Sequence, residues 1–304
     1  MKKIFFLFFF FLIADVGFSL ENQKSYELAI CAIFKEEALY LKEWIEFHKL
    51  QGVEHFFLYN NNSSDEYLEV LAPYIKKNEV TLVDWNYSYN PLEQKGNRTP
   101  WLDIQSSAYK NCVELYGNKA IWIAFIDVDE FLFCPTGARL PDFLLPYKEY
   151  GGLCVNWLLF GTSFLEDIPP GSLMIEALTR CAPTLENRNR GMKSIVQPCY
   201  VIGCKNAHSF MYKEGFFAIT VDGKKTSPTQ EYADGISHDK IRINHYWTRT
   251  ESHFRNRKIA SRKNRRNFED EQFLRGLSVN YNKNIDTAIL QFVFDLKKRM
   301  VYEE

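Results

Sequence analysis

The sequence predicts an α/β fold with a Rossmann-like, mostly parallel sheet, and three observations support it. Strand-like and helix-like segments alternate from residue 28 to residue 116. The run IWIAFI at 121–126 is apolar throughout, which is typical of a strand buried on both faces. Asp127, Asp129 and Glu130 follow it directly, and ligands of open α/β sheets bind beyond the carboxyl ends of the strands. We therefore expect a ligand site at the end of this central strand.

The elements before the central strand alternate regularly. Residues 28–34 are a short apolar strand, and residues 38–50 carry apolar side chains at helical spacing, with Gly52 placed as a C-terminal cap. The pattern continues with strands at 53–59 and 80–85 and helices at 66–77 and 101–116. Strands and helices in this order favour right-handed crossovers and parallel pairing.

After the acidic cluster the pattern becomes irregular, because prolines and glycines interrupt the chain between residues 135 and 152. The later predicted elements are strands at 152–160 and 241–247 and a helix at 285–300. We place a boundary near Tyr150, which divides the chain into halves at 26–150 and 151–304. The second half is the more irregular one and includes a basic region from Arg249 to Arg266.

Composition excludes several classes of protein. A net charge of -1 argues against general nucleic-acid binding. The seven cysteines include no C-x-x-C pair, so neither a zinc ribbon nor a thioredoxin-like site is indicated. The aromatic share of 16% is high and can supply stacking surfaces for sugars or bases.

The N-terminus at 1–20 combines two lysines with a short apolar run, as a secretory signal does. Its apolar core is too short to span a bilayer unless residues 16–20 join it. We favour a signal peptide over an N-terminal anchor, and either one predicts a secreted or membrane-associated protein.

The acidic cluster is a metal site in outline. Side chains at i and i+2 of an extended segment point the same way, so Asp127 and Asp129 would present both carboxylates to one side. A carboxylate pair can hold a divalent cation through its oxygens.

Several separated blocks, in the right order, resemble glycosyltransferase family 92 and its family 2-like relatives. They are AIFKEEALYLKEWIEFHKLQGVEHFFLYNNNSSD, WIAFIDVDEFL, GMKSIVQP and INHYWTRTESHFRNRKIASR. The resemblance implies a GT-A fold, with a nucleotide-sugar-binding first half and an irregular acceptor-binding second half. It also implies a UDP-sugar donor, with galactose as the first guess for the hexose, and a divalent ion, Mn²⁺ or Mg²⁺, at the D-x-D motif Asp127-Val128-Asp129. The acceptor would be a glycan or glycoconjugate.

The same resemblance assigns roles to individual residues. His245 in INHYW would complete the metal site, and it fits better than His208, although a core histidine is the simple alternative. Glu36, Asn60 and Asp65 would flank the uridine.

Other candidates come from the chemistry of the residues. Arg249 and Lys258 are cations for the leaving diphosphate, and Asn62 and Gln105 are candidate contacts to the nucleotide. Direct displacement with inversion needs a base for the acceptor hydroxyl, and Glu130, Glu166 and Asp167 are the candidates. Trp157 and Phe160 are either a stacking platform for a sugar or part of the core.

Two other classes of function remain open. A haloacid-dehalogenase-type phosphatase would use Asp127 as a nucleophile, and a non-catalytic sugar-binding protein would explain the aromatic residues but not the acids. The sequence is also compatible with two cellular locations. A eukaryotic enzyme would act in the Golgi lumen, whereas a bacterial protein would leave Asn61 and Asn62, both in glycosylation sequons, free of glycans.

Overall fold

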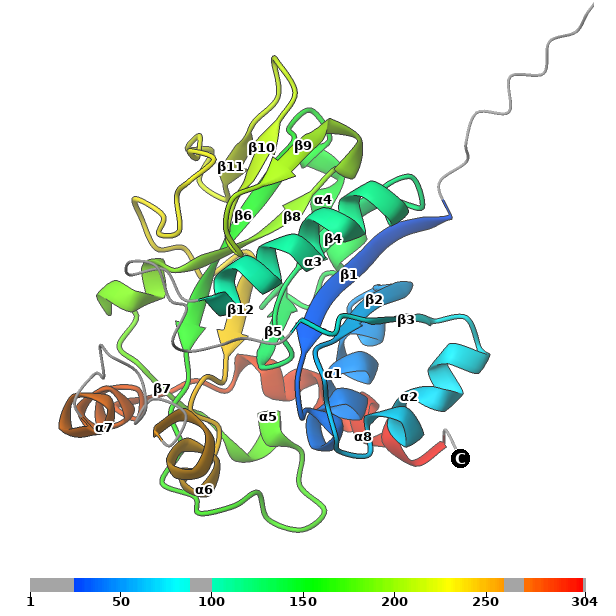
Figure 1. Ribbon diagram of the computed structural model, residues 1–304. Helices are drawn as coiled ribbons and strands as arrows, with labels where there is room; N and C mark the ends of the chain where they lie inside the picture. Colours follow the sequence, from blue (N-terminus) through cyan, green and yellow to red (C-terminus); the bar gives the residue numbers. More distant parts are fainter. Residues whose placement is uncertain (1–24, 88–99, 260–270, 303–304) are drawn as a thin grey trace, which may run out of the picture.

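The computed structural model describes residues 25–87, 100–259 and 271–302 (Figure 1). The predicted signal or anchor segment at 1–20 and the basic residues from Arg262 to Arg266 lie outside these ranges. Within the described ranges, no helix is both long and apolar enough to cross a membrane.

Four parallel strands form the first part of the central sheet, in the order β3, β2, β1, β4. They are β1 (Tyr26–Phe34), β2 (His55–Asn60), β3 (Val80–Asp84) and β4 (Ala120–Phe125), and the helices between them are α1 (Ala38–Leu50), α2 (Tyr67–Lys76) and α3 (Pro100–Tyr116). Alternate residues of β1 belong to two core clusters, Ile30 with residues of α1 and Cys31 with residues of α3. Helices therefore cover both faces, which explains why these strands are apolar throughout.

The second half of the chain extends the same sheet. The added strands are β5 (Glu130–Phe133), β6 (Gly152–Leu159), β8 (Met192–Val196), β11 (Ala218–Thr220) and β12 (Arg242–His245). β8 lies antiparallel between β4 and β6, β11 and β12 pair parallel with β6, and β5 pairs antiparallel with β12. The described residues thus form a nine-stranded, mostly parallel sheet that runs through both predicted halves.

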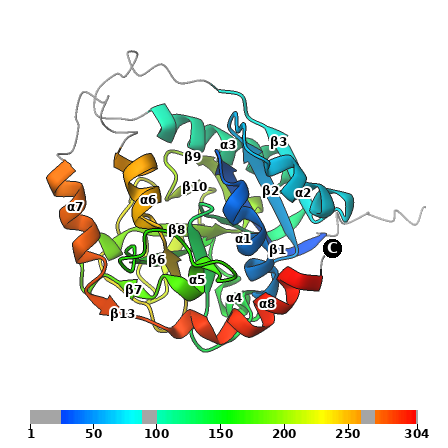
Figure 2. The ribbon, with the colours of Figure 1, turned by 90° about the horizontal axis from the view of Figure 1, so that it is seen from below.

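The remaining elements surround this sheet. They are α4 (Leu140–Leu144), α5 (Met174–Ala177), β7 (Arg180–Cys181), β9 (Val201–Cys204), β10 (Phe210–Tyr212), α6 (Glu251–His253), α7 (Glu271–Asn280), β13 (Asn284–Ile285) and α8 (Val293–Tyr302). β9 with β10, and β7 with β13, form two small antiparallel sheets. Figure 2 shows α8 running beside α1, where the ammonium of Lys42 donates to the carbonyl of Met300.

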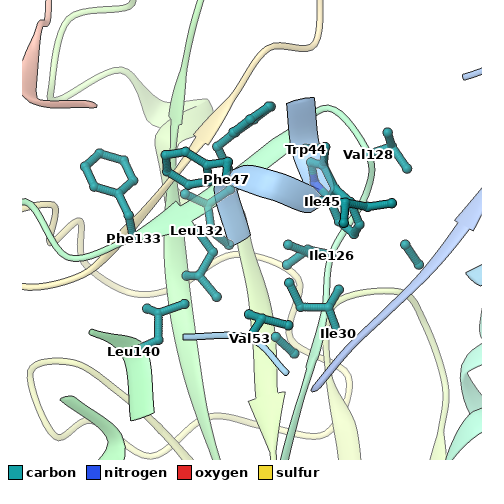
Figure 3. Packing of buried hydrophobic residues seen from close by; sticks show 14 of the residues in the cluster. Ile30, Trp44, Ile45, Phe47, Val53, Ile126, Val128, Leu132, Phe133 and Leu140 are labelled. Carbon is teal, nitrogen blue, oxygen red and sulfur yellow. The ribbon is translucent and has the colours of Figure 1, made fainter. Parts of the chain in front are cut away.

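The larger core cluster joins α1 to the turn that carries the acids (Figure 3). Trp44 is fully buried, and its indole Nε1–H donates to the carbonyl of Glu130 over 2.8 Å. His48 Nε2 accepts the backbone N–H of Leu132, while Nδ1 lies 2.8 Å from the carbonyl of Trp44. Burial lowers the pKa of His48 to about 3, so its ring is neutral and links α1 to β5. Packing and two hydrogen bonds therefore fix the acidic turn against α1.

The predicted α/β fold with a mostly parallel sheet is confirmed, and α1 has the predicted ends. Two local predictions are wrong. The helix expected at 285–300 begins only at Val293, because Ile285 pairs with Arg180 in a small sheet and a 3-10 turn follows. The acid pair does not lie on an extended strand either, because β4 ends at Phe125 and a turn follows before β5.

Candidate active site

The turn between β4 and β5 is held by its own backbone and by β12. Glu130 Oε2 accepts the backbone N–H of Asp127 over 2.9 Å, and the carbonyl of Asp129 accepts the N–H of Tyr246 over 2.8 Å. Val128 is buried in the core between the two aspartates. The two carboxylates are consequently held on a rigid turn at the carboxyl end of β4.

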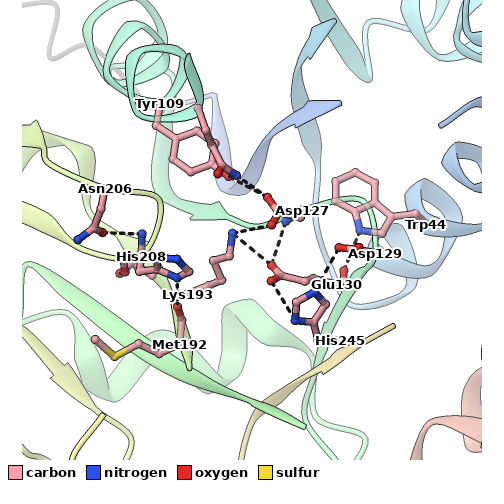
Figure 4. Close-up of polar contacts among 12 residues, drawn as sticks. Trp44, Tyr109, Asp127, Asp129, Glu130, Met192, Lys193, Asn206, His208 and His245 are labelled. Carbon is pink, nitrogen blue, oxygen red and sulfur yellow. Dashed lines mark hydrogen bonds and ion pairs between the residues drawn. The ribbon is translucent and has the colours of Figure 1, made fainter. Parts of the chain in front are cut away.

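Asp127 is already engaged on both carboxylate oxygens (Figure 4). Its Oδ1 accepts from Gln105 Nε2 over 2.6 Å and lies 3.4 Å from the hydroxyl of Tyr109. Its Oδ2 accepts from Lys193 Nζ over 2.9 Å. The Lys193 side chain is 1% exposed and its ammonium also lies 3.7 Å from Glu130 Oε2. Lys193 is thus a buried cation between two carboxylates, and the sequence interpretation missed it.

Asp129 faces a lysine and a histidine. Lys258 Nζ lies 3.3 Å from its Oδ2, and His245 Nε2 lies 3.5 Å from its Oδ1. Burial alone would raise the pKa of Asp129, but Lys258, His245 and Arg249 together hold that pKa well below its usual range. Asp129 is therefore ionised and oriented toward His245.

His245 reaches this position because β12 pairs with β5 and places it opposite Glu130. Its ring lies 4.7 Å from that of Trp157, which packs against Gly191. A Cβ on Gly191 would come within 2.0 Å of the Trp157 ring, so glycine is required there. The other candidate, His208, faces the carbonyl of Met192 instead.

The fit of this site to a metal ion is partial. In the described part of the chain, no three His, Cys, Asp or Glu side chains are grouped so as to hold a metal ion. Asp129 and His245 are adjacent and supply the carboxylate and imidazole donors that divalent cations accept. Asp127, the third predicted ligand, is occupied by Lys193 and Gln105. Asp129 and His245 can therefore supply two ligands to a divalent cation. Oxygens of a bound phosphate group would complete its coordination.

Arg249 is a second buried cation near the acids. Its side chain is 1% exposed, and its Nη2 lies 2.5 Å from Glu37 Oε2. The guanidinium carbon is 3.8 Å from the centre of the Tyr40 ring, within cation–π distance. Among the described residues, Arg249 Nε and Nη1 have no hydrogen-bond partner. A buried guanidinium with free donors is a candidate for binding an anionic group.

Two adjoining cavities follow the carboxyl ends of β1 and β4. The first has a volume of about 220 Å³ and contains Asp127, Asp129, Glu37 and Lys258 together with Phe34 and Trp101. The second has a volume of about 440 Å³, and Lys35, Glu37 and Lys258 line both cavities. Glu36 and residues of the α6 region line the second cavity as well. We call the two together the donor groove.

Backbone conformation supports a functional role for this region. Glu36 and Arg249 have positive φ angles of 56° and 49°, which are uncommon for residues other than glycine. Such strained residues cluster at functional sites, where the surrounding structure holds them. Glu36 lines the donor groove, and Arg249 contacts Glu37, which lines it as well.

The predicted nucleotide residues hold the loops that border the groove. Glu36 Oε1 accepts both the N–H and the hydroxyl of Ser64, and Asn60 Oδ1 accepts the N–H of Ser63. Asp65 Oδ2 accepts the N–H of Ala38 at the start of α1. These side chains therefore shape the loops.

Asn62 and Gln105 occupy opposite kinds of environment. Asn62 is exposed on the loop after β2, with a positive φ of 55°. Gln105 is buried and holds Asp127. Their predicted contacts to the nucleotide remain predictions.

The three candidate bases lie in different surroundings. Glu130 is fully buried, and burial raises its pKa to about 7 against the opposing effect of the Lys193 ammonium. Glu166 is exposed and forms a bidentate pair with Arg255. Asp167 accepts a hydrogen bond from the hydroxyl of Ser252 and lines a cavity. Of the three, Asp167 is the carboxylate that lines this cavity.

Trp157 and Phe160 differ in their burial. Phe160 is fully buried against the ring of Tyr246, so of its two predicted roles the structure supports the position in the core. Trp157 is half-buried beside His245, where stacking remains a prediction. Lys193 and Glu37 are the main residues that the sequence interpretation passed over, although both lie in the conspicuous blocks quoted above.

Comparison with known proteins gives a family match. The model of glycosyltransferase family 92 matches residues 24–274. A glycosyltransferase family 92 protein of Ricinus communis is 29% identical over 217 residues, covering 69% of this chain and 36% of its own length. Galactan β-1,4-galactosyltransferase GALS2 of Arabidopsis thaliana is 25% identical over 130 residues, which are 42% of this chain and 24% of that protein. The chain thus spans about a third of the length of the curated Ricinus relative.

Among solved structures, S. aureus TarS 1–349 is similar at 13% identity with a TM-score of 0.34, covering 57% of this chain and 48% of that one. The complex of the same fragment with UDP-GlcNAc has 11% identity and a TM-score of 0.34, covering 69% and 62%.

Proposed function

Because the chain belongs to glycosyltransferase family 92, we propose that it transfers a hexose from a UDP-sugar to a hydroxyl group of a glycan. The observation that carries this proposal is the donor groove, where Asp127, Asp129 and Lys258 line one cavity at the carboxyl ends of β1 and β4. Nucleotide ligands bind at this edge of parallel sheets. Galactose is our choice of hexose, since two Arabidopsis relatives are named galactan β-1,4-galactosyltransferases.

The cations around the groove suit a diphosphate leaving group. Lys35 and Lys258 line it, and buried Arg249 lies beside Glu37 at its wall. Cleavage of a glycosyl–phosphate bond places negative charge on the diphosphate, and preorganised cations stabilise that charge best in a site shielded from water. We assign this role to Lys258 and Arg249.

A divalent cation, Mn²⁺ or Mg²⁺, is part of the proposal. Asp129 Oδ1 and His245 Nε2 would supply two ligand positions, and the donor phosphates would supply others. Such a cation acts as a Lewis acid that neutralises the leaving diphosphate. Asp127 has a different role in this scheme. Gln105 and Lys193 hold its carboxylate rigidly beside the donor groove, as a fixed hydrogen-bond acceptor.

We assign the base to Asp167. An acceptor hydroxyl that enters from the neighbouring cavity would give its proton to this carboxylate while its oxygen attacks the anomeric carbon and the bond to the diphosphate breaks. A single displacement of this kind inverts the configuration at that carbon. Ser252 donates to Asp167 and fixes the orientation of the carboxylate.

The phosphatase alternative lacks support from the geometry. It needs Asp127 as a free nucleophile, whereas Gln105 and Lys193 hold both of its oxygens. A sugar-binding protein without activity would not need ionised Asp129 beside a strained, buried Arg249.

The test is an assay of the purified chain with UDP-galactose, UDP-glucose and a guanosine-linked donor, with Mn²⁺ and a β-1,4-galacto-oligosaccharide acceptor. We expect release of UDP together with elongation of the acceptor, fastest with UDP-galactose. Asp129→Asn should lower the rate at least about a hundredfold. Asp142→Asn, on an exposed face of α4, is the matched control and should retain the rate. Release of phosphate from a simple phosphoester without cleavage of any donor would instead support a phosphatase.

A further inference from the structure

A further cavity of about 500 Å³ is lined by residues from the start of α1, the loop after β6 and the α6 region. Its volume falls within the range of about 300–1,000 Å³ that is typical of small-molecule sites. None of the roles assigned above to the nucleotide or the metal uses it. We call it the α1–α6 pocket.

The walls of the α1–α6 pocket combine an apolar surface with many short polar groups. The apolar wall consists of Leu39, Ile168, Pro169 and Met174. The polar groups are those of Asp167, Ser172, Thr250, Ser252, His253 and Asn256. Leu39 is 81% exposed, so its side chain is available to a ligand. An apolar wall opposed by hydroxyl, amide and carboxylate groups suits a sugar ring, which has apolar C–H faces and a rim of hydroxyls.

The pocket adjoins the donor groove. His253, Asn256 and Arg257 line both the α1–α6 pocket and the larger cavity of the groove. That cavity in turn shares Glu37 and Lys258 with the cavity that holds the aspartates. The pocket therefore lies next to the groove, and a ligand bound in the groove has the pocket beside it.

The charges in the pocket favour a neutral ligand. Both carboxylate oxygens of Glu43 accept backbone N–H groups, from Met174 and Ile175, so this acid is used inside the fold. Asp167 and Arg257 remain as one negative and one positive group on the lining. His253 adds no charge, because burial and the nearby Arg249 lower its pKa to about 3. An acceptor rich in phosphate or carboxylate would meet Asp167 without a matching excess of cations.

We propose that the α1–α6 pocket binds a neutral oligosaccharide acceptor, with the reacting sugar beside Asp167 and further hexose units behind it. The protein is then a chain-extending transferase, which prefers an oligosaccharide over a single sugar. This inference rests on the proposed function, because it takes the donor groove as the place where the new bond forms.

The experiment measures kcat/KM for β-1,4-linked galacto-oligosaccharides from monosaccharide to pentasaccharide, with UDP-galactose as donor. We expect kcat/KM to rise about tenfold or more with acceptor length, the effect of one or two additional net hydrogen bonds. Leu39→Trp and Ser172→Trp fill the pocket from two different segments and should each remove most of this rise. Leu185→Trp is the matched control, because Leu185 is 86% exposed and lines neither the pocket nor the groove.

Two results would overturn the inference. One is equal efficiency for the monosaccharide and the pentasaccharide in the unmodified protein. The other is a length dependence that survives both tryptophan substitutions. Hydrolysis of UDP-galactose without acceptor separates this failure from that of the proposed function. A protein that cleaves the donor but ignores acceptor length keeps the proposed function and loses only the oligosaccharide subsite, whereas a protein that cleaves no donor loses both.

Discussion

Lys193 is the residue whose replacement tests the charge arrangement of the site most directly. Lys193→Met keeps a long aliphatic side chain but removes the ammonium that lies 2.9 Å from Asp127 and 3.7 Å from Glu130. We expect the free energy of unfolding to fall by about 3–5 kcal/mol, because the change leaves fully buried Glu130 and partly exposed Asp127 without their cation.

The structure sets the size of this effect. At an effective dielectric constant of about 20, the attraction to ionised Asp127 amounts to about 6 kcal/mol. The attraction to Glu130 is at most about 4.5 kcal/mol, because its pKa of about 7 leaves this carboxyl only partly ionised near neutral pH. Lys193 is 1% exposed, so burying its ammonium costs several kcal/mol and offsets part of that gain. The expected loss lies below the summed attractions for this reason.

Urea denaturation followed by tryptophan fluorescence measures the loss. A double-mutant cycle with Asp127→Asn isolates the pair, and we expect a coupling free energy of about 2 kcal/mol or more. The matched control is the exposed pair Lys110–Glu114 on α3, whose atoms lie 3.6 Å apart. Its coupling should be about 0.5 kcal/mol or less. A coupling for Lys193 no larger than that of the exposed pair would refute the reasoning.

Three further predictions concern other parts of the chain. His245→Ala should weaken Mn²⁺ binding in the presence of UDP by about tenfold or more, measured by calorimetric titration, and an unchanged affinity would return His245 to a structural role. Burial raises the pKa of Glu43 from 4.5 to about 7. Between pH 4.5 and pH 7 the folded state therefore binds one proton that the unfolded state has lost. The free energy of unfolding should fall by up to about 3 kcal/mol as the pH rises from 4.5 to 7. Glu43→Gln should lack this slope in thermal denaturation, and parallel pH profiles would contradict the shift. Asn61 donates to the carbonyls of Trp85 and Tyr87, whereas Asn62 is exposed, so any N-linked glycan in this loop should be found on Asn62 by peptide mapping. A glycan on Asn61 is incompatible with the loop as it is folded.

The regular part of the fold was predictable because its signals are local. Periodicity within α1 and the unbroken apolar runs of β1 and β4 are properties of neighbouring residues. The segment at 285–300 also has helical spacing, yet its first part is not an α-helix. Asp286 binds Arg242 of β12 and accepts the N–H of Ala288, and these contacts, one of them 44 residues distant in sequence, fix the chain in another conformation. Local pattern carries no information about such partners.

The candidate site was predictable in its acids but not in its cations. A D-x-D motif after an apolar run is visible in the sequence. The contact between Asp127 and Lys193 is not, because Lys193 lies 66 residues further along the chain. A usable signal was present, since Lys193 is a lone charge inside the buried strand MKSIV. A lysine is almost never fully buried unless it is paired, so its position predicts a carboxylate partner, although not which one.

The pairing of β8 explains why that partner is Asp127. β8 runs antiparallel to β4, with Ser194 opposite Phe125, so Lys193 lies just beyond the end of β4, at the level of the acidic turn. A parallel strand at this place would bring its own carboxyl end there instead. The register matters as much as the direction, because side chains alternate between the two faces of a strand. A shift of β8 by a single residue would turn Lys193 to the opposite face and place Met192 or Ser194 toward Asp127. The charge of the acidic turn therefore depends on the register of an inserted strand, and substitutions within β8 that weaken this register should disturb the donor groove as strongly as a change in the groove itself.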